Sequence, residues 1–224
     1  MTDSVRVIAI DGPSGSGKGT IARRVAAALG YHLLDSGALY RLTAYAAGRQ
    51  GIALGDTAAL ANIARNLQIQ FGSDAEGNER VLLNGEDVTF NIRTEDAGNG
   101  ASQVAAQAPV RDALLELQRS FRKAPGLVAD GRDMGTHVFV DAELKIYLTA
   151  SAGERARRRH KQLMDKGIDV SLAALSRDIV DRDRRDTERS VAPLRPAEDA
   201  RLLDSSGQSI EAVTNTVLDW ANTG

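Results

Sequence analysis

Residues 12–20 have the composition and spacing of a phosphate-binding loop. They read Gly-Pro-Ser-Gly-Ser-Gly-Lys-Gly-Thr and contain the G-x-x-x-x-G-K core of the P-loop. Glycines allow backbone N–H groups to converge on a phosphate without Cβ clashes, and Lys18 supplies a mobile positive charge for the outer phosphates. The sequence therefore predicts a site for a nucleoside triphosphate formed by Gly12, Pro13, Ser14, Gly15, Ser16, Gly17, Lys18, Gly19 and Thr20.

The segments on either side of this loop fit the same interpretation. A β-branched run precedes Asp11, and apolar residues at helical spacing (Ile21, Val25, Leu29) follow the loop. A helix beginning there would add the positive end of its dipole to the phosphate site. The alternative, an ordinary glycine-rich turn between a strand and a helix, leaves nine consecutive matches to the motif unexplained.

The position after Lys18 departs from the commonest form of the motif. Many P-loop proteins place a Mg²⁺-ligating hydroxyl directly after the lysine. Here that residue is Gly19, and the hydroxyl comes one position later, at Thr20. The Gly-Lys-Gly-Thr ending is the form associated with nucleoside monophosphate kinases.

Two charged segments follow other predicted strands. Asp35-Ser36-Gly-Ala-Leu-Tyr40-Arg41 follows residues 31–34, and Asp130-Gly-Arg132-Asp133-Met-Gly follows residues 126–129. Ligand sites in open α/β sheets lie at the carboxyl ends of the strands. Attack of one phosphate on another needs several cations, and arginine binds two phosphate oxygens at once. We therefore expect an acceptor site at these strand ends.

Within these segments the residue types indicate particular roles. Arg41 and Arg132 suit a phosphate, and Asp133 suits the amino group of a base. Asp130 stands where P-loop proteins often keep an acid that organises Mg²⁺. We expect no direct protein ligand to the metal, with Thr20 and Asp130 acting on it through water. The alternatives are a surface arginine at position 41 and a helix cap with salt bridges around Arg132.

The pattern of apolar segments predicts an α/β fold of the P-loop type, a three-layer parallel sheet flanked by helices. Further core strands are expected at 145–148 and 201–203, and a closing helix at 207–224. A small antiparallel β insert is expected within residues 62–102, with hairpins over 67–88 and a turn at Ser73–Asn78. The core would then comprise 1–61 and 103–224. Its charged arm, about 152–190, is expected to be a helical lid or a solvated face.

Composition narrows the classes of function. The 224 residues carry a net charge of −2, which gives no overall electrostatic reason to expect nucleic acid or membrane as a partner. There is no cysteine, and the three histidines are far apart in the sequence, so no metal cluster is expected. No apolar run is long enough to span a membrane, and the N-terminus leads directly into the first predicted strand. We therefore expect a cytoplasmic protein.

Six segments, taken together, closely resemble the bacterial cytidylate kinase family over nearly the whole chain. They are residues 12–20, 34–41, 92–94, 101–106, 130–135 and the segment from Arg182 to Leu194. The Asp-Ser-Gly-x-x-Tyr-Arg and Asp-Gly-Arg-Asp-Met-Gly blocks are far more specific than the P-loop. The resemblance implies an ATP- and Mg²⁺-dependent kinase that converts CMP or dCMP to the diphosphate. It also implies a monophosphate-binding insert, a mobile lid and a monomer.

The resemblance also implies roles for the matching residues. Ser36, Tyr40, Arg41 and Arg132 would surround the acceptor phosphate, and Ser102, Arg111 and Asp133 would read the cytosine edge. Arg182 and Asp186 would contact the sugar, and Arg189 the phosphates during closure. Lys18, Arg132, Arg182 and Arg189 are the expected catalytic residues.

Three other functions remain alternatives at this stage. One is a kinase for UMP, AMP or a small hydroxylated metabolite. Another is a nucleotide switch, against which the sequence has no Asn-Lys-x-Asp guanine motif. The third is nucleic-acid binding through the arginine-rich arm; against it, the arm is only mildly basic, the whole chain has a net charge of −2, and the arm has no interleaved aromatic residues.

Overall fold

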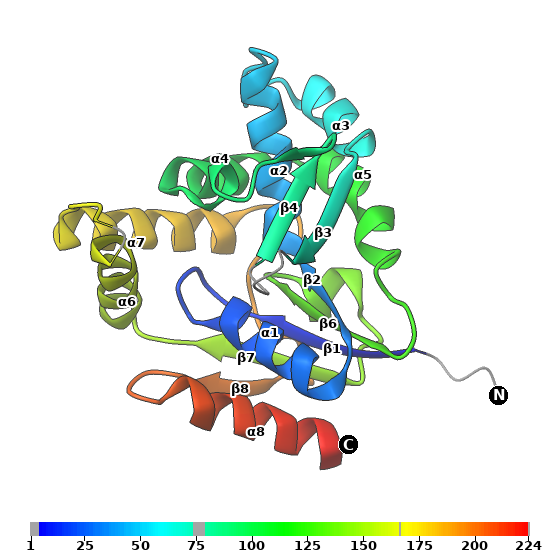
Figure 1. Cartoon of the computed structure of the whole chain (residues 1–224), viewed down its shortest axis with the longest axis vertical. Helices are drawn as coiled ribbons and strands as arrows, with labels where there is room; N and C mark the ends of the chain where they lie inside the picture. The colour runs from blue at the N-terminus through cyan, green and yellow to red at the C-terminus, as the bar shows by residue number, and fades with distance from the viewer. Residues whose placement is uncertain (1–4, 74–78, 166, 224) are drawn as a thin grey trace. The chain divides into compact units, whose positions relative to one another are not determined.

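The strand β1 (Arg6–Asp11) lies in the middle of a five-stranded parallel sheet of order β2-β6-β1-β7-β8. It precedes the phosphate-binding segment of residues 12–20, called the glycine loop from here on. Its neighbours are β6 (Gly126–Gly131) and β7 (Leu144–Thr149), with β2 (His32–Asp35) and β8 (Arg201–Asp204) at the two edges. Residues 7–10 are almost completely buried, which explains their uninterrupted apolar run. The predicted parallel sheet is confirmed (Figure 1).

This computed structural model describes residues 5–73, 79–165 and 167–223. The chain divides into two units, one formed by Met1–Asp35 with Gln118–Gly224 and the other by Ser36–Leu117. The predicted insert, residues 62–102, falls inside the second unit. Within the described ranges, no helix combines the length and the apolar character needed to cross a membrane.

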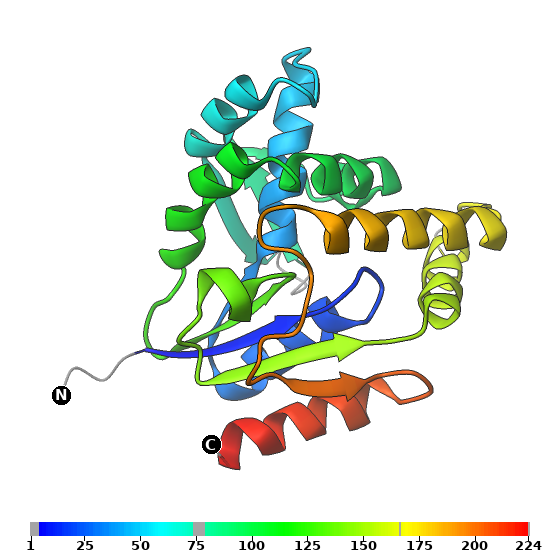
Figure 2. The ribbon, with the colours of Figure 1, turned by 180° about the vertical axis from the view of Figure 1, so that it is seen from behind.

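In the first unit, α1 (Lys18–Leu29) and α8 (Ile210–Thr223) cover one face of the sheet (Figure 1 and Figure 2). Ile21 and Val25 of α1 and Val217 of α8 belong to one apolar core with Ile8, Ile10, Val128, Ile146 and Leu148 of the strands. Gly17 and Gly30 flank α1 in left-handed conformations, which side chains rarely adopt. The glycines therefore fix where this helix begins and ends.

The charged arm forms two helices of the first unit. They are α6 (Ala152–Met164), which follows β7, and α7 (Leu172–Glu188), and the two pack against each other. Ser151 and Ser171 cap their N-termini by accepting backbone N–H groups. A five-residue helical turn, Met134–Val138, follows β6 and lies against β1.

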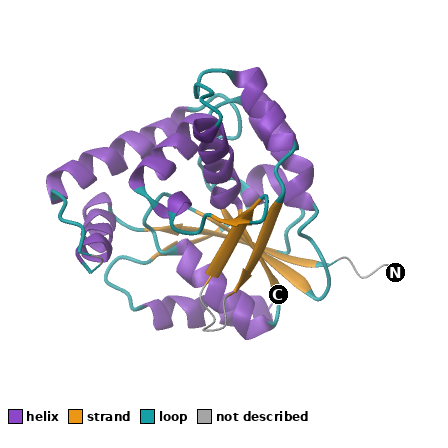
Figure 3. Cartoon of the chain, turned by 45° about the horizontal axis from the view of Figure 1, so that its top comes forward, coloured by secondary structure: helices purple, strands orange, loops and turns teal. Residues whose placement is uncertain are grey.

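The second unit combines helices with a small antiparallel sheet of order β3-β4-β5. The two longer strands, β3 (Ile69–Ser73) and β4 (Glu79–Leu83), appear as adjacent arrows in Figure 3. Residues 74–78 of the predicted turn lie outside the described residues. The remaining elements are α2 (Ser36–Arg49), α3 (Thr57–Arg65), β5 (Glu86–Asp87), a short 3₁₀ turn (Asn91–Arg93), α4 (Glu95–Ala105) and α5 (Ala108–Arg119). The predicted small antiparallel sheet is confirmed.

Candidate active site

The glycine loop connects β1 to α1 and has a backbone that only glycine can adopt at its first position. Gly12 has a φ of 156°, and a Cβ built there would lie 2.0 Å from the carbonyl oxygen of Leu148 on β7. Gly15 and Gly17 also have positive φ, at 78° and 92°. The loop therefore folds closely over the neighbouring strand and presents its N–H groups at the start of a helix, as phosphate binding requires.

Lys18, the first residue of α1, turns back over the loop. Its side chain is buried, and Nζ donates a hydrogen bond of 3.1 Å to the carbonyl oxygen of Pro13. Ser16 is fully buried, and its Oγ has no hydrogen-bond partner among the residues the structure describes. The ammonium group and a buried hydroxyl are thus both held within the loop.

The structure explains why glycine rather than a hydroxyl residue follows Lys18. A Cβ at Gly19 would lie 3.0 Å from Oδ2 of Asp130, the carboxylate near the end of β6. A side chain at position 19 would crowd this acid, which lies beside the first turn of α1, where Thr20 follows. A carboxylate and a hydroxyl are oxygen donors of the kind that Mg²⁺ prefers. No cluster of three or more His, Asp or Glu suited to a metal occurs in the described part of the chain.

Asp11, at the end of β1, is buried and joins two strand ends. Its Oδ1 accepts the backbone N–H of Met134 and its Oδ2 that of Gly135, each at 2.8 Å. Burial raises the pKa of Asp11 to about 7; the Gly135 N–H opposes this rise, and the nearby charges of Asp133 and Asp130 add to it. The carboxylate therefore fixes the turn after β6 relative to the glycine loop.

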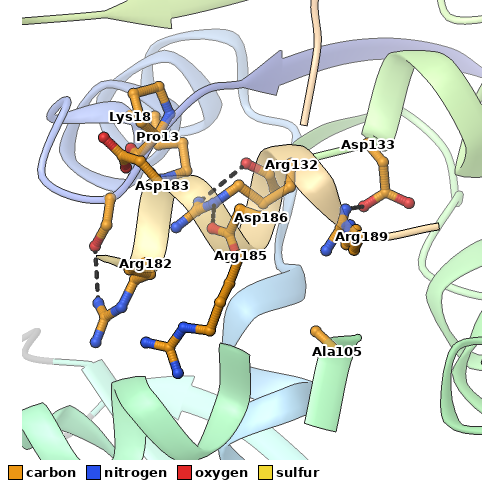
Figure 4. A network of polar contacts seen from close by, with 12 residues as sticks. Pro13, Lys18, Ala105, Arg132, Asp133, Arg182, Asp183, Arg185, Asp186 and Arg189 are labelled. Carbon is orange, nitrogen blue, oxygen red and sulfur yellow. Dashed lines mark hydrogen bonds and ion pairs between the residues drawn. The ribbon is translucent and has the colours of Figure 1, made fainter. Parts of the chain in front are cut away.

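Helix α7 contributes a series of polar contacts to the same end of the sheet (Figure 4). Arg182 donates to Oγ of Ser14 at 3.0 Å, which joins α7 to the glycine loop. Asp186, one turn further along, accepts from Nε of Arg132 at 2.9 Å. Arg189, which directly follows α7, lies 3.4 Å from Oδ1 of Asp133, and both of these side chains are almost completely buried.

The charge state of Arg132 follows from these neighbours. Burial alone would lower its pKa, but the carboxylates of Asp186 and Asp130 outweigh that effect and raise the pKa above its usual value. The guanidinium therefore stays charged at the end of the sheet.

A cavity of about 450 Å³ lies beside the glycine loop in the first unit. Its lining includes Gly15 and Thr20 of the loop, Glu154 and Arg158 of α6, and Ser205 after β8. Arg158 donates to Oε1 of Glu154 at 3.0 Å and to both Oγ and the carbonyl oxygen of Ser205, at 3.0 and 2.6 Å. Ser205 Oγ also lies 3.0 Å from the Ser16 carbonyl oxygen, so the loop, α6 and the segment after β8 form one wall.

The second unit brings together another group of the predicted residues. Ser36 and Tyr40 lie one turn apart on α2, and both are buried. The guanidinium carbon of Arg111, on α5, lies 5.6 Å from the centre of the Tyr40 ring, and Nη1 donates to the Ala105 carbonyl oxygen at 3.3 Å. Ser102 is buried on α4, which packs against α2, while Arg41 is only partly buried.

Comparison with known proteins identifies the family. A model described as cytidylate kinase matches residues 8–223. The chain belongs to the cytidylate kinase family. A protein named cytidylate kinase from Cupriavidus necator is 60% identical, over 96% of this chain and 95% of its own length. Another, from Pseudomonas aeruginosa strain UCBPP-PA14, is 59% identical over 97% and 96%. Resemblance to the cytidylate kinases, and the phosphotransferase activity it predicts, are therefore confirmed.

Likeness to a solved structure supports the fold. The crystal structure of an uncharacterized protein from Eubacterium ventriosum has a TM-score of 0.51 and 12% identity, covering 98% of this chain and 99% of that one. Membership of the cytidylate kinase family implies a nucleotide kinase that acts on small molecules, with ATP as a substrate and typically Mg²⁺.

In this cytidylate kinase family member, each unit holds its own set of the residues predicted from sequence. The first unit brings the glycine loop together with Asp130, Arg132, Asp133, Arg182, Asp186 and Arg189. The second holds Ser36, Tyr40, Arg41, Ser102 and Arg111.

From the sequence, Asp11 is expected near the chemistry only as one of several Asp residues at strand ends, and Arg155 and the Arg158–Ser205 pair, which the structure also places at the loop, have no predicted role. Asp11 had a usable signal, because it ends a strand as Asp35 and Asp130 do. Nothing in the sequence distinguished the two arginines from their neighbours in the basic arm.

Proposed function

We propose that this chain transfers the γ-phosphoryl group of ATP to CMP or dCMP, giving ADP and CDP or dCDP. Its membership of the cytidylate kinase family supports this proposal. The observation that carries it at the level of the site is the placement of Arg132, Arg182 and Arg189 around the end of the sheet that bears the glycine loop. Phosphoryl transfer depends mainly on such positioning and charge neutralisation.

On the donor side, the loop residues 12–20 would hold the β- and γ-phosphates through backbone N–H groups. Lys18 would exchange its contact with the Pro13 carbonyl for a phosphate oxygen, which a mobile ammonium group does readily. The neighbouring cavity, about 450 Å³, has the size of a small-molecule site and would take the adenosine. Arg158 borders it and offers a flat guanidinium on which a purine can stack.

The metal would be held at Thr20 and Asp130, through water. The position of the Asp130 carboxylate beside Gly19 suits this arrangement, because it places an acid next to the phosphate-binding helix start. When bound, Mg²⁺ neutralises charge on the phosphate oxygens. The chain's own contribution is to keep this acid clear of a side chain at position 19.

On the acceptor side, Arg132 and Arg189 would bind phosphate oxygens, and Arg182 with Asp186 would contact the sugar. Asp133 would accept a hydrogen bond from the N4 amino group of cytosine, which uracil lacks. In the structure Arg132 and Arg189 are paired with Asp186 and Asp133. Substrate would therefore replace protein carboxylates with phosphate on charged groups that are already in place.

For the second unit, we propose roles for single residues. Ser36, Tyr40 and Arg41 would contact the acceptor phosphate, and Ser102 and Arg111 the cytosine edge. Residues 62–102 would form the monophosphate-binding subdomain. The burial of Ser36, Tyr40, Ser102 and Arg111 supports a binding role, since packing already holds these side chains in place before a substrate binds.

The arm of about residues 152–190 would act as a lid that excludes water during transfer. Its second helix supplies Arg182 and Asp186, and Arg189 directly follows that helix. A lid in which these groups exchange their protein contacts for phosphate contacts only when both substrates are bound would limit wasteful hydrolysis of ATP. Hydrolysis in the absence of acceptor should consequently be slow.

An acceptor panel tests the proposed function. CMP, dCMP, UMP and AMP are compared as acceptors, with ADP release measured for each. We expect kcat/KM for CMP or dCMP to exceed that for UMP and AMP by at least about 100-fold. Equal rates with AMP or UMP would overturn the cytidine assignment, and acceptor-independent hydrolysis would indicate a nucleotide switch instead.

A variant at the base-reading carboxylate refines this test. Asp133→Asn keeps the side-chain shape but introduces a donor that can face the O4 of uracil. We expect the ratio of kcat/KM for CMP to that for UMP to fall by at least about tenfold. An unchanged ratio would remove Asp133 from base recognition.

We further propose that the protein is a cytoplasmic monomer. The absence of cysteine among its 224 residues suits a reducing compartment, and the monomer is what the resemblance to the cytidylate kinase family implies. Light scattering on the purified protein, and fractionation of the cells that produce it, would test the two statements separately.

A further inference from the structure

Arg155, in the first turn of α6, uses all three of its side-chain nitrogens to join different parts of the first unit. Nε donates to the carbonyl oxygen of Ala150 at 2.9 Å, and Nη1 to that of Ser14 at 3.0 Å. Nη1 and Nη2 also donate to the two carboxylate oxygens of Asp183, at 3.0 and 2.5 Å. One guanidinium therefore links the end of β7, the glycine loop and α7.

This ion pair differs from the exposed pair Arg184–Asp181 on the same arm. The side chain of Arg155 is 5% exposed and that of Asp183 26%, whereas those of Arg184 and Asp181 are 64% and 60% exposed. Two-point pairing of arginine with carboxylate fixes orientation as well as distance. An exposed pair on a helix surface contributes little. The Arg155–Asp183 pair can therefore help to define where α7 lies against α6 and the glycine loop, which the exposed Arg184–Asp181 pair cannot.

The residue that this pair places most directly is Arg182, the neighbour of Asp183 on α7. Arg182 donates to Oγ of Ser14 at 3.0 Å, and Arg155 donates to the carbonyl oxygen of the same serine at 3.0 Å. Figure 4 shows Arg182 and Asp183 on adjoining positions of α7 near the glycine loop. Residues of the arm thus hydrogen-bond to both the side chain and the backbone carbonyl of Ser14.

The packing of α6 also places Arg155 against the glycine loop. A Cβ at Gly15 would lie 3.1 Å from Cβ of Arg155, so the first turn of α6 sits directly on the loop backbone. Gly15 also lines the cavity. The backbone of Arg155 is therefore held against the loop by packing, independently of the ion pair that its guanidinium makes with Asp183.

We propose that the Arg155–Asp183 pair is a positioning device that sets Arg182 at the glycine loop for phosphoryl transfer. The proposal rests on the proposed function, in which Arg182 acts during the reaction. Neither Arg155 nor Asp183 needs to touch substrate. Loss of the pair leaves the fold and the nucleotide site in place but releases Arg182 from its productive geometry, which lowers kcat.

The decisive experiment is a double-mutant cycle between Asp183→Asn and Arg182→Ala, measured as kcat and KM for ATP. We expect Asp183→Asn alone to lower kcat at least about tenfold, with KM for ATP changed less than about threefold. In the Arg182→Ala background the same substitution should change kcat by less than about twofold. Asp181→Asn, on the exposed pair of the same helix, serves as the matched control and should leave kcat unchanged.

The results separate the possible failures. If Arg182→Ala itself leaves kcat unchanged, the proposed role of Arg182 fails. If Arg182→Ala lowers kcat but Asp183→Asn does not, or if their effects simply multiply, the positioning role is wrong. Should Asp183→Asn prove unfolded by circular dichroism, Asp183→Glu, which keeps the charge, replaces it. The proposal is supported if Asp183→Glu lowers kcat about threefold or more when Arg182 is present and leaves kcat unchanged in the Arg182→Ala background. It is overturned if Asp183→Glu lowers kcat by the same factor in both backgrounds.

Discussion

Asp11 and Met134 are joined by a hydrogen bond of 2.8 Å in which the carboxylate at the end of β1 accepts the backbone N–H of the turn after β6. The glycine loop begins at the next residue after Asp11, and Arg132 and Asp133 immediately precede Met134. One buried carboxylate therefore sets the distance between the proposed donor-binding and acceptor-binding segments of the first unit.

The raised pKa of Asp11 predicts an unusual pH dependence of stability. Because its folded-state pKa, about 7, lies above the ordinary value of 3.8, its contribution to stability is lost as pH rises from about 4 through 7. Asp11→Asn cannot ionise and lacks this loss. We expect the stability of the variant relative to wild type to increase by about 2 to 4 kcal/mol between pH 4.5 and pH 8, measured by urea unfolding.

Wild type and Asp11→Asn must be compared with each other because other carboxylates change stability with pH in the opposite direction. Arg122, for example, lowers the pKa of Asp141 through a side-chain hydrogen bond, so the contribution of Asp141 is lost as pH falls. These groups are present in both proteins and cancel in the difference. Parallel stability curves for wild type and Asp11→Asn would show that Asp11 does not titrate in this range.

Replacing Lys18 should affect catalysis far more than folding. Lys18→Met keeps the buried aliphatic stem and removes the charge that would meet the outer phosphates. We expect kcat to fall by about 10²- to 10³-fold while the thermal midpoint stays within a few degrees of wild type. Lys123→Met, at an exposed position in the same unit, is the control and should retain full activity. Comparable activity of both variants would contradict the role of Lys18.

Gly12→Ala should disable the loop for steric reasons. The added Cβ would lie 2.0 Å from the Leu148 carbonyl oxygen, at a φ of 156° that alanine rarely adopts. We expect a loss of more than about 3 kcal/mol of stability together with loss of ATP binding, measured by urea unfolding and calorimetry.

Gly30→Ala is the matched comparison for this change. Gly30 also has a positive φ, 66°, but a Cβ there meets nothing within 4 Å. It should cost only about 1 kcal/mol and leave ATP binding intact. If the two variants were equally destabilised, backbone conformation rather than contact with Leu148 would determine the effect.

Arg189→Ala should lower kcat more than it raises KM for ATP, because Arg189 is expected to meet the phosphates during transfer. A decrease of about 10²-fold in kcat is expected from the loss of one such charged contact. Steady-state kinetics with ATP and CMP would check this. An unchanged kcat would remove Arg189 from the transition state.

The same substitution carries a structural effect that must be measured separately. Arg189 is paired with buried Asp133, and loss of one partner of a buried pair destabilises a protein. Arg189→Lys retains a positive charge near Asp133 and separates the two effects. We expect Arg189→Lys to keep a free energy of unfolding close to that of wild type while its kcat is still lowered, since lysine does not bind phosphate in the two-point manner of arginine.

The sequence was informative where chemistry and local structure coincide. The apolar runs that end in Asp11 and Asp130 predict two strand ends, because strands buried in a parallel sheet are continuously apolar. The run before Asp35 is also a strand, but it lies at the edge of the sheet and is only partly buried. The glycine loop was equally clear. The sequence shows that Gly19 replaces the hydroxyl residue common in P-loops, but it does not show why. The carboxylate that a side chain at position 19 would crowd belongs to Asp130, more than 100 positions away.

Contacts within the arm were beyond sequence reasoning. Arg155 and Arg157 stand two positions apart in the same basic run, yet the first is buried at the loop and the second has a side chain 65% exposed. Helical phase separates them, and only the packing of α6 on Gly15 decides which face is inside. The same holds for Arg189, whose pairing with Asp133 spans two elements.

The hydrogen bond from Ser205 to the Ser16 carbonyl oxygen connects residues 189 positions apart. During synthesis the glycine loop leaves the ribosome early, but the segment that fixes its outer wall is made among the last. A growing chain therefore lacks this wall of the proposed nucleotide site until residue 205 is in place, and a ligand stabilises only states in which its site exists. We expect nucleotide to protect the folded chain against unfolding more than a chain that ends before Ser205.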